Sequence, residues 1–175
     1  MGRGSAKDAK SWSGNATKND TASNRPKYIN ERRPKVFFDI ALRGKDLGRI
    51  VMELFGENAP CASENFRMLC SGERGKNPKQ GAMSYKGCTF FKIQPGAYIC
   101  SGDIVENDGT SGYSVYGSGF PNESYTDRHT EPGYIAMIKG AKGNNSQFMI
   151  ITRPIPKFDG RQQVVGRVLE GMDIV

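Results

Sequence analysis

The sequence is poor in the residues on which metal and nucleophilic catalysis commonly depend. Its 175 residues contain one histidine, His129. A histidine-rich zinc site is therefore excluded, a catalytic triad would need this single residue, and we expect a structural role for it. The four cysteines, at positions 61, 70, 88 and 100, form no C-x-x-C pair, and we interpret them as reduced packing residues.

Long apolar runs are also missing. No run approaches the roughly 18 apolar residues that a membrane-spanning helix needs, and no apolar segment typical of a secretory signal follows the N-terminus. These absences, together with the interpretation of the cysteines as reduced thiols, indicate an intracellular protein without a membrane partner. The cytoplasm is the expected compartment, with mitochondria and the nucleus as open alternatives.

Positive charge is in excess, and it is concentrated at the N-terminal end. The net charge is +7, and residues 1–34 contribute +5 of it, from eight Lys and Arg against three Asp and Glu. This stretch has Trp12 and Tyr28 as its only aromatic residues, so it cannot bury enough surface to fold alone. The sequence therefore predicts a basic, low-complexity extension over 1–34 and a folded domain over 35–175.

Three interpretations of the extension are open. It can be a solvated tail, an arm that binds an acidic protein partner or RNA phosphates, or a mitochondrial presequence. Asp8 and Asp20 weigh against the presequence, which is poor in acidic residues. We favour the arm, with a protein partner first and RNA second.

The body alternates short apolar segments with turn residues. Residues 35–42 and 48–55 predict a β-hairpin, and 61–70 has the apolar spacing of a short amphipathic helix that Gly72 would end. Loops are expected over 72–87 and 102–133, and a turn over 140–145. Further strands are expected over 89–93, 98–100, 134–138, 146–151 and 163–169. This pattern is typical of a mainly β protein, a β-barrel with helical caps.

Ten segments, in order along the body, resemble the cyclophilins. They are Lys35–Ile40, Leu47–Leu54, Glu64–Arg67, Ser71–Glu73, Tyr85–Cys88, His129–Thr130, Pro132–Gly133, Ser146–Phe148, Asp159–Gly160 and Val168–Met172. The resemblance implies a closed eight-stranded antiparallel barrel capped by two helices, with peptidyl-prolyl cis-trans isomerase activity. It also implies that the final helix and strand, which in the family follow the last of these segments, are missing at Val175. We expect the barrel edge left open to be covered by another segment or another chain.

The implied reaction has simple chemical requirements. Rotation about a peptide bond meets a barrier of about 18–20 kcal/mol, and the twisted transition state leaves a lone pair on the proline nitrogen. A donor aimed at that nitrogen stabilises the transition state preferentially, while an apolar socket holds the ring. No metal, cofactor, nucleophile or general base is needed. The resemblance places Lys92 at the position of the family's catalytic Arg, and Lys lacks the planar fork of donors that Arg presents.

The resemblance also assigns the rest of the substrate groove, and most of its residues differ from the family pattern. Ala97 opens the wall of the proline socket, Cys100 replaces an amide with a weak thiol donor, and Lys157 stands at the position of a Trp. Gln147 is retained. The expected substrate-binding residues are Tyr98, Cys100, Ile138, Lys139, Gln147, Met149, Phe158 and Gln162.

Two functions from different classes follow. The first is a structural or proline-peptide-binding component of a larger intracellular assembly, with weak or no isomerase activity, contacted through residues 1–34 and the open barrel edge. The alternative is an active prolyl isomerase of altered specificity that catalyses protein folding. RNA association through the basic extension is a third hypothesis.

Overall fold

The structure, a computed structural model, describes residues 33–175. The predictions for the extension, its protein or RNA partners included, therefore lie outside the described residues, except at Arg33 and Pro34. These two residues contact the body. Arg33 Nη2 lies 2.6 Å from Glu57 Oε1, and the carbonyl of Pro34 accepts a hydrogen bond of 2.9 Å from the backbone N–H of Leu54.

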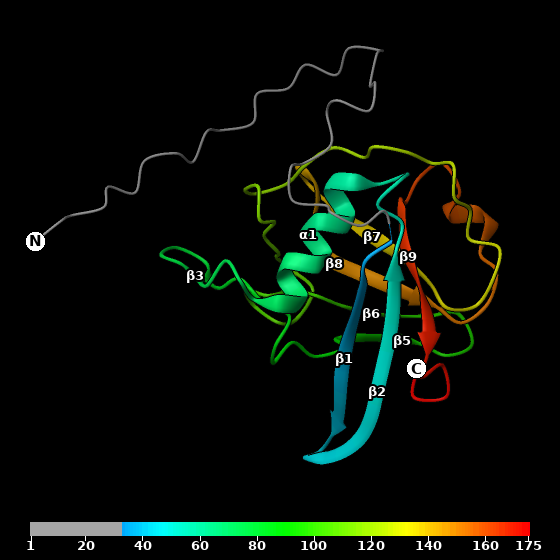
Figure 1. Ribbon diagram of the computed structural model, residues 1–175, viewed down its shortest axis with the longest axis horizontal. Helices are drawn as coiled ribbons and strands as arrows, with labels where there is room; N and C mark the ends of the chain where they lie inside the picture. Colours follow the sequence, from blue (N-terminus) through cyan, green and yellow to red (C-terminus); the bar gives the residue numbers. More distant parts are fainter. Residues whose placement is uncertain (1–32) are drawn as a thin grey trace, which may run out of the picture.

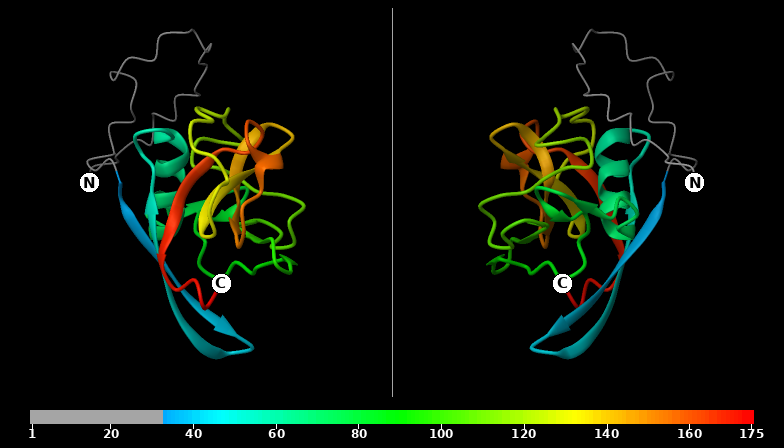
Figure 2. Two further views of the ribbon diagram at one scale, coloured as in Figure 1. Left: turned by 90° about the vertical axis from the view of Figure 1, so that its right-hand side faces the viewer. Right: turned by 90° about the vertical axis from the view of Figure 1, so that its left-hand side faces the viewer.

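One curled antiparallel sheet of seven strands dominates the described residues, in the order β1-β2-β9-β7-β8-β6-β5 (Figure 1). β1 and β5 are its two end strands, and the side views show the β1–β2 hairpin extending away from the remainder of the sheet (Figure 2). The strands are β1 (Lys35–Leu42), β2 (Lys45–Leu54), β5 (Lys92–Gln94), β6 (Tyr98–Ser101), β7 (Tyr134–Gly140), β8 (Gly143–Ile151) and β9 (Val164–Glu170). The expected mainly β, antiparallel class is confirmed.

The principal hydrophobic core fills the concave side of this sheet. Helix α1 (Pro60–Ser71) packs there against β1, β8 and β9 (Figure 1). The ring of Phe66 on α1 lies 5.0 Å from that of Phe148 on β8, and the ring of Tyr85 lies 5.2 Å from Phe148. We call this group of buried side chains the inner core. Its largest fully buried members are Phe66, Phe148, Ile50, Met52, Leu54, Leu69, Ile135, Met137 and Ile150.

The ends of α1 follow from local chemistry. Pro60 stands at the first helical turn, where a missing N–H costs nothing, and Gly72 ends the helix with a left-handed φ of 69°. The carboxylate of Glu123 accepts the backbone N–H groups of Cys61 and Ala62 in the first helical turn, at 2.7 and 2.9 Å. The helix predicted over 61–70 is thus confirmed, and it is anchored at its start by the long loop.

Some boundaries differ from expectation. The strand predicted over 89–93 is reduced to β5, because Thr89 bonds through its N–H to the side chain of Asn107 at 2.7 Å, away from any strand. The predicted loop over 72–87 contains a small hairpin of β3 (Lys76–Asn77) and β4 (Gly81–Ala82). The turn predicted over 140–145 is shorter, since β7 and β8 pair as far as Gly140 and Gly143.

Helical content is low among the described residues. The described residues contain one α-helix, α1, and one short 3₁₀-helix, Pro156–Phe158. No helix within residues 33–175 combines the length and apolar character needed to cross a membrane.

The loop over 102–133 is organised by one carboxylate. Asp103 accepts the backbone N–H groups of Val105, Glu106, Gly109 and Ser111, and the hydroxyl of Ser111 at 2.7 Å. Burial opposes ionisation of this group, but the hydrogen bonds from Ser111 and the backbone prevail and lower the pKa of Asp103 to about 2. A long segment of low periodicity therefore has a fixed conformation beside β6.

Candidate functional site

A second apolar cluster lies on the convex side of the sheet, over β6, β7 and β8. On β8, Phe148 and Ile150 belong to the inner core, whereas Met149 and Ile151 belong to this cluster, because successive side chains of a strand point to opposite faces. We call it the outer patch. Its buried members are Ala97, Cys100, Ala136, Met149, Ile151 and Ile155, and its partly buried members are Phe91, Tyr98, Tyr134, Ile138 and Phe158.

A row of alternating cations and rings crosses the edge of the outer patch. Lys92 Nζ lies 5.7 Å from the ring centroid of Tyr98, and this ring lies 5.9 Å from that of Phe158. Lys157 Nζ lies 5.3 Å from the centroid of Phe158. All three separations are short enough for cation–π and edge-to-face ring contacts. The two predicted site residues Lys92 and Phe158 are thus connected through Tyr98.

Cys100 on β6 lies opposite Lys92 in the strand register and is nearly fully buried. It pairs with Lys92 on β5 and with Met149 on β8. Burial raises the pKa of Cys100 to about 11, and the positive charge of Lys92 opposes this only in part. The thiol is therefore protonated at neutral pH, which makes it an apolar wall and a poor nucleophile.

Two other predicted site residues, Gln147 and Gln162, form hydrogen bonds within the protein. The side-chain amide nitrogen of Gln147 donates to the carbonyl of Gly109 at 3.1 Å and to that of Ser111, so it fastens the 102–133 loop to β8. The backbone N–H of Gln162 donates to the carbonyl of Phe158 at 2.9 Å. Its side-chain oxygen Oε1 is buried and has no hydrogen-bond partner among residues 33–175.

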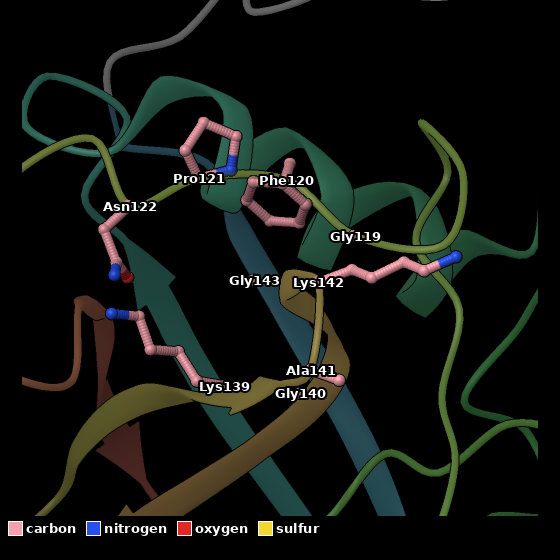
Figure 3. Close-up of a pocket in the computed structure, with 9 residues that line it drawn as sticks. All are labelled: Gly119, Phe120, Pro121, Asn122, Lys139, Gly140, Ala141, Lys142 and Gly143. Atoms are coloured by element: carbon pink, nitrogen blue, oxygen red, sulfur yellow. The ribbon is translucent and has the colours of Figure 1, made fainter.

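Lys139 is directed away from the outer patch, although its neighbour Ile138 packs against the patch. It lines a shallow hollow of about 630 Å³ between the 119–122 segment and the β7–β8 turn. Figure 3 shows its amino group pointing toward the side chain of Asn122, while Lys142 points away. Lys139 Nζ lies 3.5 Å from the hydroxyl of Tyr125. The predicted groove is therefore divided into two adjoining surfaces that meet at β7.

His129 supports the floor of the site. It is buried, and its Nδ1 lies 2.9 Å from Asp159 Oδ1, which also accepts the backbone N–H of His129 at 2.8 Å. That backbone bond is the main reason why the pKa of Asp159 is lowered. The imidazole ring meets the ring of Phe158 edge-on at 5.8 Å. This geometry fits the structural role expected for the single histidine.

Sequence reasoning missed several residues of the outer patch, notably Phe91, Ala136, Ile151 and Ile155. One signal was available. The uninterrupted apolar run Phe148–Ile151 is typical of a strand buried on both faces, whereas a strand with one face in water alternates. The segment 152–162, which carries Ile155 and Phe158, supplies the cover on the second face.

The arrangement is suited to binding an apolar ring beside a positive charge. Within residues 33–175, no three His, Cys, Asp or Glu side chains are grouped so that they could hold a metal ion.

One comparison with known proteins bears on this site. Residues 37–175 match the family model described as "Cyclophilin type peptidyl-prolyl cis-trans isomerase/CLD". The matched range contains all the strands named above apart from the first two residues of β1, and the whole outer patch. The chain therefore belongs to the cyclophilin-type peptidyl-prolyl cis-trans isomerase family.

Proposed function

We propose that this chain binds proline-containing peptide segments on its outer patch, as a component of a larger intracellular assembly, with weak or no isomerase activity. The observation that carries the proposal is the row from Lys92 to Phe158. An apolar surface is retained there, but the group at the family's donor position is an exposed lysine held near the ring of Tyr98.

The chemistry explains why binding and catalysis separate at such a site. A proline ring needs an apolar surface, which the partly exposed rings of Tyr98 and Phe158 offer over the buried Met149 and Ala97. Catalysis needs a donor placed against the proline nitrogen in the twisted state, and removing one such donor costs about 10²–10³ in rate. Lysine carries a single flexible point charge, so it positions a donor less firmly than the fork of arginine does.

Two features support the assembly part of the proposal. The extension over 1–34 carries a charge of +5, which attracts acidic surfaces. β1 is an end strand of the sheet and exposes Phe37 and Leu42, both at least half accessible to solvent. An end strand offers backbone groups to which a partner strand can pair. Within residues 33–175, Cys70, Cys88 and Cys100 form no disulfide, which supports a reducing, intracellular location, with the cytoplasm first.

An active isomerase of altered specificity is the second candidate function. It is favoured by one observation: position 92 still carries a cation, and Lys92 Nζ lies near the ring of Tyr98 in the outer patch. If Lys92 reaches the proline nitrogen of a bound substrate, it supplies the same kind of stabilisation as an arginine, only less rigidly.

The experiment compares isomerisation and binding on the same X-Pro peptides. The full chain is measured beside Lys92→Arg, Lys92→Ala and the distant control Lys45→Ala. We expect all four proteins to bind the peptides measurably. The rate of cis-trans exchange in the presence of the wild type should be close to the uncatalysed rate. Strong acceleration that falls about 10²-fold or more in Lys92→Ala would establish the active isomerase instead. Absence of any proline-dependent binding would refute both functions.

A further inference from the structure

The charges of the folded body are unevenly placed around the outer patch. Every patch residue outside β7 and β8 comes from segment 91–100 or segment 152–162. Together these two segments hold four cations and one carboxylate, whereas the other residues of 35–175 hold thirteen cations against fourteen carboxylates. The cations are Lys92, Arg153, Lys157 and Arg161. The net positive charge of the body is therefore confined to the segments that border the patch.

These four cations are also unpaired, unlike most arginines elsewhere. Arg49 is bound to Asp39 at 2.7 Å, Arg67 to Glu64 at 2.8 Å and to Glu73 at 2.7 Å. None of the four cations of these two segments has an ion-pair partner within the part of the chain that the structure describes. Asp159 is the single carboxylate of the two segments, and its Oδ1 already accepts the backbone N–H of His129 and lies within hydrogen-bond distance of the His129 ring. Unpaired charge beside an apolar surface is available to a ligand.

The two ends of the row differ in their surroundings. At the Lys92 end, the 102–133 loop packs on Phe91 through Gly109, and this loop carries acidic residues. Two of these are satisfied within the loop, since Asp103 accepts the donors named above and Asp108 accepts the hydroxyl of Thr110 at 2.6 Å. A further acidic residue near Gly109 in the sequence is Glu106, which is exposed. At the other end, Lys157 stands over Phe158 beside the backbone of Arg161, whose N–H donates to the carbonyl of Phe158.

We infer that the outer patch selects acidic proline-containing peptides, with a peptide carboxylate paired to Lys157 while the proline ring packs on the partly exposed rings of Phe158 and Tyr98. The inference rests on the proposed peptide-binding function and names the class of peptide for that same site. Lys157 is a specificity-determining residue here. Its ammonium contributes a charge contact and the adjoining ring contributes apolar area, so an acidic side chain next to a proline satisfies both.

The test uses three fluorescent peptides of equal length around one Ala-Pro pair, flanked by Glu, by Gln or by Lys, and titrated with the full chain. We expect the Glu peptide to bind about three- to ten-fold more tightly than the Gln peptide, and the Lys peptide to bind least, as for one or two partly exposed charge contacts. Raising the salt concentration from about 20 to about 300 mM should reduce the preference, because the Debye length shortens.

Variants separate the patch from the basic extension, which attracts acidic peptides of any sequence. Lys157→Glu should remove or invert the preference, whereas Lys45→Glu, with the same charge change on the β1–β2 hairpin, should retain it. A Glu peptide with its proline changed to alanine should lose most of its affinity. Equal binding of the three peptides would overturn the inference and leave the proposed function standing. Binding of acidic peptides without need of proline, or no binding at all, would overturn both.

Discussion

The two faces of β8 differ in how completely they are covered, and this difference separates folding from binding. Phe148 on the concave face is 1% exposed and packs among the rings of α1 and the residues before β5. Met149 on the convex face is 4% exposed, but its neighbours Tyr98 and Phe158 remain partly open to solvent. The inner core is closed by the chain itself, whereas the outer patch has room for a ligand at its rim.

The largest expected effect tests this contrast on adjacent residues. Phe148→Ala should reduce the free energy of unfolding by about 3–5 kcal/mol, because it leaves a cavity that the surrounding rings cannot fill. Met149→Ala should cost about 2 kcal/mol, the low end for such a change, since the open rim of the patch can relax. Urea denaturation of both variants measures the difference. Equal losses would mean that the two faces are equally closed and that the comparison fails.

The next prediction concerns the loop beside the patch. Because the pKa of Asp103 is about 2 in the folded state and near 3.9 in an unfolded chain, this group stabilises the fold above about pH 4. The stabilisation, about 2–3 kcal/mol by that difference, is lost as the pH falls from about 4 to 2. Asp103→Asn should lower the stability at pH 7 and flatten the profile in that window. Asp108→Asn, in the same loop but exposed, is the control that should retain it.

A smaller effect is expected when the rim of the patch is changed. Phe158→Ala should weaken proline-peptide binding about ten-fold, since a ring that packs on the ligand is lost from the centre of the proposed contact. Fluorescence anisotropy gives the affinity, and thermal unfolding should confirm that the variant is folded. Phe37→Ala, an exposed ring on β1, is the matched control and should bind as the wild type does. A loss of affinity in the control would move the binding surface to the hairpin.

The smallest effect should come from Lys139→Ala. Its amino group faces Tyr125 and Asn122 across the hollow, so removing it should change peptide affinity by less than about two-fold, as for an exposed and weakly held charge. The same anisotropy titration applies, with Lys142→Ala as the neighbouring control. A ten-fold loss in Lys139→Ala alone would show that the hollow and the outer patch act as one binding surface.

Most of the fold was predictable from sequence because local chemistry decides it. The β-branched and aromatic run 35–42 forms β1, and Pro60 with Gly72 brackets α1, where turn and cap preferences are strong. The strand expected over 89–93 was mostly wrong, since the side chain of Asn107, eighteen residues away, takes the N–H of Thr89. No local pattern reveals such a tertiary contact.

The candidate site was predictable in a different way. The family resemblance located Lys92, Tyr98, Cys100, Met149 and Phe158, and the structure brings these five to one patch and its rim. The resemblance gave no account of what Gln147 and Lys139 contact, because their partners lie in the 102–133 loop, whose course depends on Asp103 and on tertiary packing. Their roles in binding stay predictions.

The place of β8 between two apolar layers has a consequence for motion. Its backbone amides pair with β6 and β7 and are covered on both sides, so they should exchange with solvent deuterium only when the whole domain unfolds. β5 is a three-residue end strand with exposed side chains, and its amides should exchange through local fraying. Met149 and Lys92 therefore belong to the slowest and the fastest exchanging strands of the sheet. A ligand that touches both should slow exchange in β5 and leave β8 unchanged.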